Sequence, residues 1–270
     1  KRGNKILIAV FGFVVICVVG GYVGIHAASG LDSPLSVIMS SSMQHDNHQS
    51  AIGIIDTGDV MVVQDPNKAN IQSYIDALET EYKSFGDYGS VLIYDRGSNA
   101  NPVIHRAIVW LEYNGNDTWT ASSLQKYTAW ECSDSTDYRS LSGTLTFPDI
   151  TQSHKRVSIN LNSLEKYSGY LTMGDNPVTN ISFDQPGILS HPVRTQDIRS
   201  VAVYELPWLG IIKVYMTPDK RAYLDHVPNS IYSIIMLFVM VFAIIYCCDI
   251  FYQKKALKEK QKELERLNEL

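Results

Sequence analysis

The residues that could carry chemistry begin with Ser42, which follows a long apolar segment near the start of the chain. His105 lies further along in an apolar, strand-like segment, and two aspartates, Asp175 and Asp184, come later. A serine hydroxyl becomes an effective nucleophile only when a base removes its proton, and a carboxylate can orient that base. This set therefore supplies a nucleophile, a general base and an orienting acid.

Each of these residues also has a plain structural interpretation. Three consecutive serines, at 40–42, are typical of a strand end and a turn, and residues 174–176 and 184–187 form turn signals. Alternation in a strand would place His105 on one face with Val103 and Ala107, where a half-buried histidine can simply hydrogen-bond locally. Imidazole is nevertheless the side chain best suited to proton transfer near neutral pH, which makes His105 the candidate base.

Two apolar segments flank the part of the chain that contains these residues. Residues 6–25 and 227–248 contain no Asp, Glu, Lys or Arg, and about 20 such residues suffice for a helix to cross a bilayer. We predict transmembrane helices over 6–28 and 228–249. For the first, a cleaved signal peptide is the alternative, because Ala27-Ala28-Ser29 resembles a cleavage site, although the apolar stretch exceeds the usual length of about 7–15 residues.

The charges around these segments predict their orientation. Lys1, Arg2 and Lys5 precede the first segment, and the residues that follow the second include lysines at 254, 255, 258 and 260. Positive charge marks the cytoplasmic side, so we expect residues 1–5 and 250–270 in the cytoplasm and residues 31–226 outside it. The location would be the cell membrane or a membrane like that of the endoplasmic reticulum. The whole chain has a net charge of −5, and because both ends are positive, the middle part carries about −9. This acidity argues against a nucleic-acid-binding surface.

The middle part, residues 31–226, is predicted to form a mainly β domain. Its apolar runs are short and β-branched, with Gly, Asn, Asp and Pro between them, which predicts an antiparallel sheet. One short helix is expected over 71–85, where apolar residues recur at helical spacing. Residues 114–151 are rich in Ser, Thr and Asp and are expected to form a surface insertion or a small subdomain. The charged tail should continue the second helix, and its leucines leave pairing with another helix open.

Cysteines and possible modification sites add little chemistry. Cys132 is the one cysteine between the apolar segments, so no disulfide is expected there, and no Cys/His spacing suggests a metal site. Asn116 and Asn180 each begin an Asn-x-Ser/Thr acceptor sequence for glycosylation.

The candidate residues lie in motifs that, taken in order, resemble those of the type I signal peptidases in their archaeal and endoplasmic-reticulum form. The motifs are Ser-Ser-Ser-Met at 40–43, Gly-Asp-Val-Met-Val-Val at 58–63, Ile-His-Arg-Ala-Ile at 104–108, Thr-Met-Gly-Asp-Asn at 172–176, Asp-Gln at 184–185, and Pro-Trp-Leu-Gly at 207–210. The bacterial form has lysine in place of His105. The chain departs from the family in having Gln44-His45 where proline usually follows the motif Met, and in a longer gap between Asp175 and Asp184.

The resemblance implies a signal-peptidase-like antiparallel β-sheet domain between the two transmembrane helices. It implies a serine endopeptidase that cleaves secretory preproteins without a cofactor, in contact with membrane lipid and with the protein translocation machinery. Ser42 would be the nucleophile and His105 the base. Asp184 would orient His105 with Asp175 in support, although the sequence leaves the choice of aspartate open. The Ser42 N–H and the Ser40 hydroxyl would bind the oxyanion.

By the same resemblance, the substrate would lie extended beside a strand, as an added strand does in β-augmentation. The residues expected to bind it are Leu35, Val37, Ile38 and Met39. Two alternatives are a non-catalytic membrane-anchored binding module with the same fold, and a structural protein whose leucine-spaced tail is the functional part.

Overall fold

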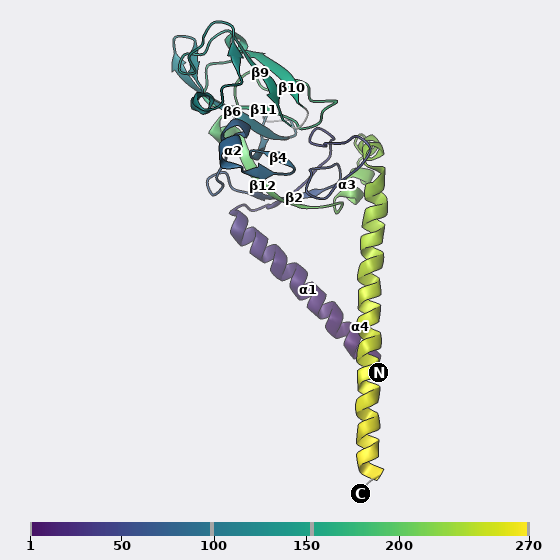
Figure 1. Ribbon diagram of the computed structural model, residues 1–270. Coiled ribbons are helices and arrows are strands. Elements are labelled where there is room, and N and C mark those ends of the chain that lie inside the picture. Colours follow the sequence, from purple (N-terminus) through teal and green to yellow (C-terminus); the bar gives the residue numbers. More distant parts are fainter. Residues whose placement is uncertain (1, 98–99, 152–153, 269–270) are drawn as a thin grey trace. The chain divides into compact units, whose positions relative to one another are not determined.

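The computed structural model describes residues 2–97, 100–151 and 154–268, which divide into two units. The first unit contains the helical segments up to Gly24 and from Ile231 onward, and the second runs from Ile25 to Ser230 (Figure 1). Lys1 of the predicted cytoplasmic N-terminus and residues 269–270 of the predicted tail lie outside the described residues.

Two long helices begin and end the described chain: α1 (Arg2–Ser29) and α4 (Pro228–Asn268). Their most apolar 18-residue windows have mean hydropathies of 1.8 and 2.7, and almost none of those residues is buried. Among the described residues, these two helices are long and apolar enough to cross a membrane. A signal sequence near the N-terminus would have the same properties as α1. The charged segment after residue 249 is helical as part of α4 through Asn268.

The second unit is built on one large antiparallel sheet, which confirms the predicted mainly β character. Its strands, in spatial order, are β1 (Leu35–Val37), β2 (Val60–Gln64), β12 (Ile198–Leu206), β5 (Val91–Tyr94), β6 (Val103–Gly115) and β11 (Gly169–Met173), and β7 (Thr118–Thr120) pairs with β6. Short β-branched runs form these strands because branched side chains pack well on a pleated surface. The strand that carries His105, β6, lies between β5 and β11.

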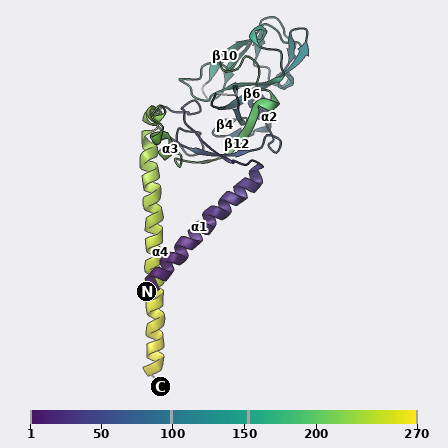
Figure 2. The same ribbon diagram turned by 180° about the vertical axis from the view of Figure 1, so that it is seen from behind.

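A second, three-stranded sheet packs near β6 and β11 (Figures 1 and 2). Its order is β10 (Lys155–Asn160), β9 (Thr144–Ile150), β8 (Glu131–Cys132). Residues 114–151, expected as a surface insertion, contribute fully buried side chains to the largest apolar core: Trp119, Leu141, Leu145 and Phe147. Burial of one such side chain stabilises a fold by about 1.5–3 kcal/mol. The segment is therefore part of the domain's core as well as its surface.

The expectation of one short helix in this unit is wrong, because its described residues form two short α-helices, α2 (Tyr74–Thr80) and α3 (Ile211–Met216). The first is shorter than the predicted 71–85. It begins after Ser73, whose hydroxyl accepts a hydrogen bond from the Asp76 N–H, and it ends at Glu81 in the left-handed conformation. The chain then forms the hairpin of β3 (Lys83–Ser84) and β4 (Asp87–Tyr88). The second helix is too short to show a helical period in the sequence.

Four 3₁₀ helices complete the described elements: η1 (Ser122–Gln125), η2 (Leu161–Ser163), η3 (Thr195–Asp197) and η4 (Arg221–His226).

Within the second unit, hydrogen bonds fix the end of α1 and the start of α4 to the β domain. The Ser29 carbonyl accepts from the Asp65 N–H at 2.9 Å, directly after β2. The Asn229 side chain accepts from the Ser50 N–H and donates to the Ser50 carbonyl, both at 2.8 Å. The last residues of α1 and the first residues of α4 are therefore hydrogen-bonded parts of the second unit itself.

Candidate active site

The site is built on β6, where His105 and Arg106 are consecutive residues and their side chains point to opposite faces of the sheet. Both are buried, with 3% and 0% of their surface exposed. A charged or polar side chain is rarely buried without partners, because losing water costs free energy that only hydrogen bonds or an opposite charge offset. Each of the two finds an aspartate.

His105 pairs with Asp184. The ring Nδ1 lies 2.8 Å from each carboxylate oxygen. Since an ionised carboxylate only accepts hydrogen bonds, Nδ1 carries the proton and Nε2 is left as an acceptor. The Tyr94 hydroxyl and the Thr172 hydroxyl also donate to Asp184 Oδ2, each at 2.6 Å. These bonds hold the carboxylate, and through it the imidazole, in one orientation.

Asp175 pairs with Arg106 instead. The guanidinium donates from Nε to Asp175 Oδ1 at 2.9 Å and from Nη2 to Oδ2, and its Nη1 donates to the Gly89 carbonyl at 2.8 Å. Burial alone would raise the pKa of Asp175, but the charge of Arg106, with hydrogen bonds from Arg106 and His45, holds that pKa below its ordinary value. Of the two aspartates left open by the sequence, Asp184 therefore orients His105, and Asp175 belongs to a buried ion pair.

The turn that carries Asp175 also holds the loop that carries Ser42. The Asn176 N–H donates to the Ser42 carbonyl at 3.0 Å, and the Asn176 side chain donates to the Ser41 carbonyl at 2.7 Å. At Gly174, a Cβ atom would lie 2.5 Å from the Ser42 carbonyl oxygen, so only glycine allows this close approach. The serine loop and the Gly-Asp-Asn turn, far apart in the sequence, thus fix one another.

Ser42 and His105 line one cavity of about 680 Å³. Ser40 lines it too, and its Oγ lies 3.5 Å from Ser42 Oγ. Among the described residues, no hydrogen bond joins Ser42 Oγ to the His105 ring, whose bonds go to Asp184. Such a bond is often long in an unliganded site and tightens when substrate binds. The candidate nucleophile and the candidate base thus line the same cavity, but no hydrogen bond joins them.

Three of the four residues expected to bind substrate line this cavity: Val37, Ile38 and Met39. Leu35, at the start of β1, is half-buried and lies outside the lining. Ile93 and Ile104 add to the apolar wall. The cavity therefore combines an apolar wall with the polar pair that could act on a peptide bond.

The Gly-Asp motif at 58–59 is hydrogen-bonded to a residue of the same apolar wall. The Asp59 carbonyl accepts from the Ile38 N–H at 2.9 Å, and Asp59 Oδ1 accepts from the Trp208 N–H at 2.8 Å. Burial raises the pKa of Asp59 to about 7 and that of neighbouring Asp56 to about 6. Asp59 thus links the motif at 207–210 to a residue of the substrate wall.

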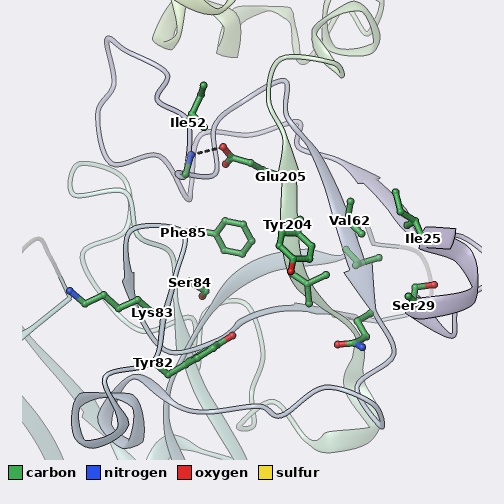
Figure 3. Close-up of a pocket in the computed structure, with 15 residues that line it drawn as sticks. Ile25, Ser29, Ile52, Val62, Tyr82, Lys83, Ser84, Phe85, Tyr204 and Glu205 are labelled. Carbon is green, nitrogen blue, oxygen red and sulfur yellow. Dashed lines mark hydrogen bonds between the residues drawn. The ribbon is translucent and has the colours of Figure 1, made fainter. Parts of the chain in front are cut away.

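A larger cavity, of about 800 Å³, lies elsewhere in the second unit, and the candidate catalytic residues do not line it. Figure 3 shows Phe85 and Tyr204 within it, between β2, β12 and the hairpin β3–β4. Its titratable groups are dispersed, and Glu205 already accepts a hydrogen bond from the Gly53 N–H. Chemistry rather than size therefore selects the smaller cavity as the candidate active site.

Sequence reasoning missed residues that hold the site together. Tyr94 ends an apolar run, and nothing in its neighbourhood indicates that its hydroxyl reaches a carboxylate 90 positions away. Arg106 could have been found, because strand alternation turns it away from the face that His105 occupies. Thr172 and Asn176 lie in the motif at 172–176, but their individual partners depend on the folded arrangement of the loops.

The two possible glycosylation sites lie in different surroundings. Asn116 is exposed in the turn between β6 and β7, whereas Asn180 lines the candidate active-site cavity. Among the described residues, no three His, Cys, Asp or Glu side chains lie together in a way that could hold a metal ion.

Comparison of the chain with models of protein families found no match, and searches of curated proteins and of solved structures found none either. The resemblance to signal peptidases therefore depends on the sequence motifs alone.

Proposed function

We propose that this protein is a membrane-anchored serine endopeptidase that removes signal peptides from secretory preproteins. The observation that carries the proposal is that His105, held by Asp184, lines the same cavity as Ser42. The sequence motifs and the two long apolar helices support the choice of substrate, because a preprotein's own apolar segment would hold it in the same bilayer. Confinement of both partners there raises their effective concentration.

In the proposed reaction, Ser42 Oγ forms a bond to the carbonyl carbon of the scissile peptide while His105 Nε2 takes the hydroxyl proton. The negative charge that develops on the carbonyl oxygen is bound by the Ser42 N–H and the Ser40 hydroxyl. Among the described residues the Ser42 N–H has no hydrogen-bond partner, so it is free to donate, and loss of one such donor typically costs about 10²–10³-fold in kcat.

The second half of the reaction reverses these proton movements. The carbon–nitrogen bond breaks as His105 gives its proton to the leaving amine. Water then attacks the acyl-serine, with His105 again as base, and releases the carboxylate product and Ser42. Asp184 stays ionised throughout and stabilises the imidazolium that forms in each step.

The proposed location is a membrane with the β domain on its extracytoplasmic side. The flanking lysines and arginines support this topology through the bias of positive charge to the cytoplasm. Membrane lipid and the translocation machinery that delivers preproteins are the proposed partners.

The test uses the full chain in membranes with a preprotein that has small residues one and three positions before the cut. We expect Ser42→Ala and His105→Ala each to lower the single-turnover rate by about 10⁴-fold or more, since the triad acts as a unit. The matched controls are Ser33→Ala and His154→Ala, whose side chains are exposed outside the cavity. Cleavage at the parental rate by both Ser42→Ala and His105→Ala contradicts the proposal.

A second candidate is a binding module of the same fold without catalysis. The absence of a Ser42–His105 hydrogen bond among the described residues favours it. The same experiment separates the two, because a binding module would retain the preprotein in a pull-down from membranes while neither parent nor variant cleaved it.

A further inference from the structure

The cavity that contains Ser42 and His105 is bordered by three cationic side chains: Arg96, Lys213 and Lys220. They come from three places, the end of β5, the helix α3 and the turn that follows it. The one acidic residue in the lining is Asp219, whose carboxylate is exposed and 3.9 Å from Lys220 Nζ. The lining is therefore positive, in a domain whose sequence from 31 to 226 carries about −9.

The backbone around these cations is fixed. On α3, Ile211 and Val214 are buried, and the Lys213 carbonyl accepts from the Thr217 hydroxyl at 2.8 Å. Lys213 itself has no ion-pair partner among the described residues. Arg96 Nε donates to the Asn101 carbonyl at 3.1 Å, a neutral partner that leaves its charge uncompensated.

Because Asp219 offsets Lys220, the excess positive charge of the lining equals that of Arg96 and Lys213. A cleft with an excess of one sign of charge raises the local concentration of ligands of the opposite sign. A carboxylate and a lipid phosphate share this chemistry. The observations favour a carboxylate on the peptide, because the cations line the cavity that also contains Ser42 and His105. An anion held there lies beside the bond that would be cut.

We propose that Arg96, Lys213 and Lys220 select peptide substrates that carry an acidic side chain close to the scissile bond. This inference rests on the proposed function. The resemblance to signal peptidases implies small substrate residues one and three positions before the cut, and the inference adds a charge preference to these. Each cation acts by binding the substrate, so its loss should change kcat/KM mainly through KM.

The experiment compares preproteins that differ only in having Glu, Gln or Lys at one of the positions flanking the cut. The full chain is placed in vesicles of neutral lipid, and kcat/KM is measured at low and at high salt. We expect the order Glu, Gln, Lys, with about fivefold between steps at low salt, as one charge pair at about 4 Å in water predicts. The steps should shrink at high salt because the side chains are exposed to solvent.

Charge reversal provides the specific variants. Lys213→Glu or Lys220→Glu alone brings the charge of the lining from +2 to 0 and should remove the preference among the three substrates. The double variant Lys213→Glu/Lys220→Glu brings it to −2 and should invert the order, so that the Lys substrate becomes the best and the Glu substrate the worst. A mere loss of folding would lower all three rates together. Lys126→Glu is the control, because Lys126 is exposed, pairs with Glu79 and lies outside the cavity. It should leave the order of the substrates unchanged.

Each other outcome has a definite meaning. If the parent cuts all three substrates equally while Ser42→Ala is inactive, the charge preference is wrong and proteolysis stands. If Ser42→Ala still cleaves, the proposed function itself fails. A third arm adds anionic lipid to the vesicles: if Lys213→Glu alters only the response to that lipid and not the order of substrates, the cations bind lipid phosphate and the inference is overturned.

Discussion

Two neighbouring residues of β6, His105 and Arg106, are each paired with an aspartate, and the two pairs differ in what they leave free. Arg106 donates to Asp175 and to several backbone carbonyls, so its donors are occupied and its charge is neutralised. His105 uses one ring nitrogen for Asp184 and keeps the other as an acceptor. One pair is suited to holding loops together, and the other to moving a proton.

The difference follows from side-chain chemistry more than from position. Both pairs are buried, and both aspartates belong to the segment after β11. Arginine stays charged in proteins and presents donors in a rigid fork that matches a carboxylate, whereas neutral imidazole has one donor and one acceptor. Buried carboxylates with similar surroundings can therefore have structural or chemical roles according to the base that faces them.

The largest expected effect comes from Asp184→Asn. An amide can donate to Nδ1, which would move the ring proton to Nε2 and leave His105 unable to accept the proton of Ser42. We expect the single-turnover cleavage rate to fall by about 10⁴-fold, as it does when the orienting aspartate of a triad is replaced. The melting temperature should change little, and the exposed Asp32→Asn should change neither property.

Asp175→Asn should lower stability strongly and the cleavage rate less. It leaves the guanidinium of Arg106 buried without a counter-charge, which typically costs about 3–5 kcal/mol of folding free energy. Equilibrium denaturation measures this loss, and cleavage assayed well below the melting temperature should be less affected than in Asp184→Asn. If Asp175→Asn abolished cleavage with full stability and Asp184→Asn only destabilised the fold, the two roles would have to be exchanged.

A third carboxylate site sharpens the comparison, because Asp56 and Asp59 are buried and form no ion pair with a Lys or Arg of the described residues. Burial raises the pKa of Asp56 from 3.8 to about 6, and Asp56 Oδ1 has no hydrogen-bond partner. The native state thus binds these protons more tightly than the unfolded chain does. Their contribution to stability is fully present below the ordinary pKa and is lost as the pH rises through about 6 to 7.

Asp56→Asn removes one of these titrations and also a charge that adds to the effect of burial in raising the pKa of Asp59. We expect the fall in unfolding free energy between pH 5 and pH 8 to be smaller in the variant than in the parent, by at most about 3 kcal/mol. The variant should be the more stable protein at pH 8. Identical pH profiles for Asp56→Asn, the parent and the exposed control Asp225→Asn would show that Asp56 does not titrate in this range.

The strands and the opposite faces of His105 and Arg106 could be predicted from the sequence, because strand alternation is a local property. The choice between Asp175 and Asp184 could not, because it depends on how the segment after β11 returns to the sheet. There, the Asp184 N–H donates to the Thr172 carbonyl at 2.9 Å and places the carboxylate beside His105. Family resemblance favoured Asp184, but spacing alone did not.

The segment 114–151 shows a different limit. Trp119, Leu141 and Phe147 are fully buried, yet they are scattered among Ser, Thr and Asp, and the one short strand-like alternation here is that of Leu145 and Phe147 with threonines. Phe147 lies in β9, which pairs with its neighbours in the sequence, β8 and β10, and Trp119 pairs with Leu141 in an isolated bridge. The high average polarity of residues 114–151 therefore predicted a surface segment, whereas a few of its large side chains form part of the core.

The smallest effect, from Tyr94→Phe, tests whether orientation of Asp184 matters apart from its charge. The change removes the hydroxyl that donates to Asp184 Oδ2 at 2.6 Å and leaves the ring in place. Loss of one hydrogen bond to a charged group is worth about 1.5–3 kcal/mol, and the Thr172 hydroxyl still donates to the same oxygen. We expect kcat to fall by about tenfold with KM unchanged.

Tyr127→Phe, which loses a hydrogen bond to the Asp149 carbonyl, is the matched control and should keep the parental kcat. Equal rates in parent and Tyr94→Phe would mean that His105 and Thr172 suffice to hold the carboxylate. The contrast between the two pairs on β6 would then depend on His105 and Asp184 alone, without the wider set of donors around them.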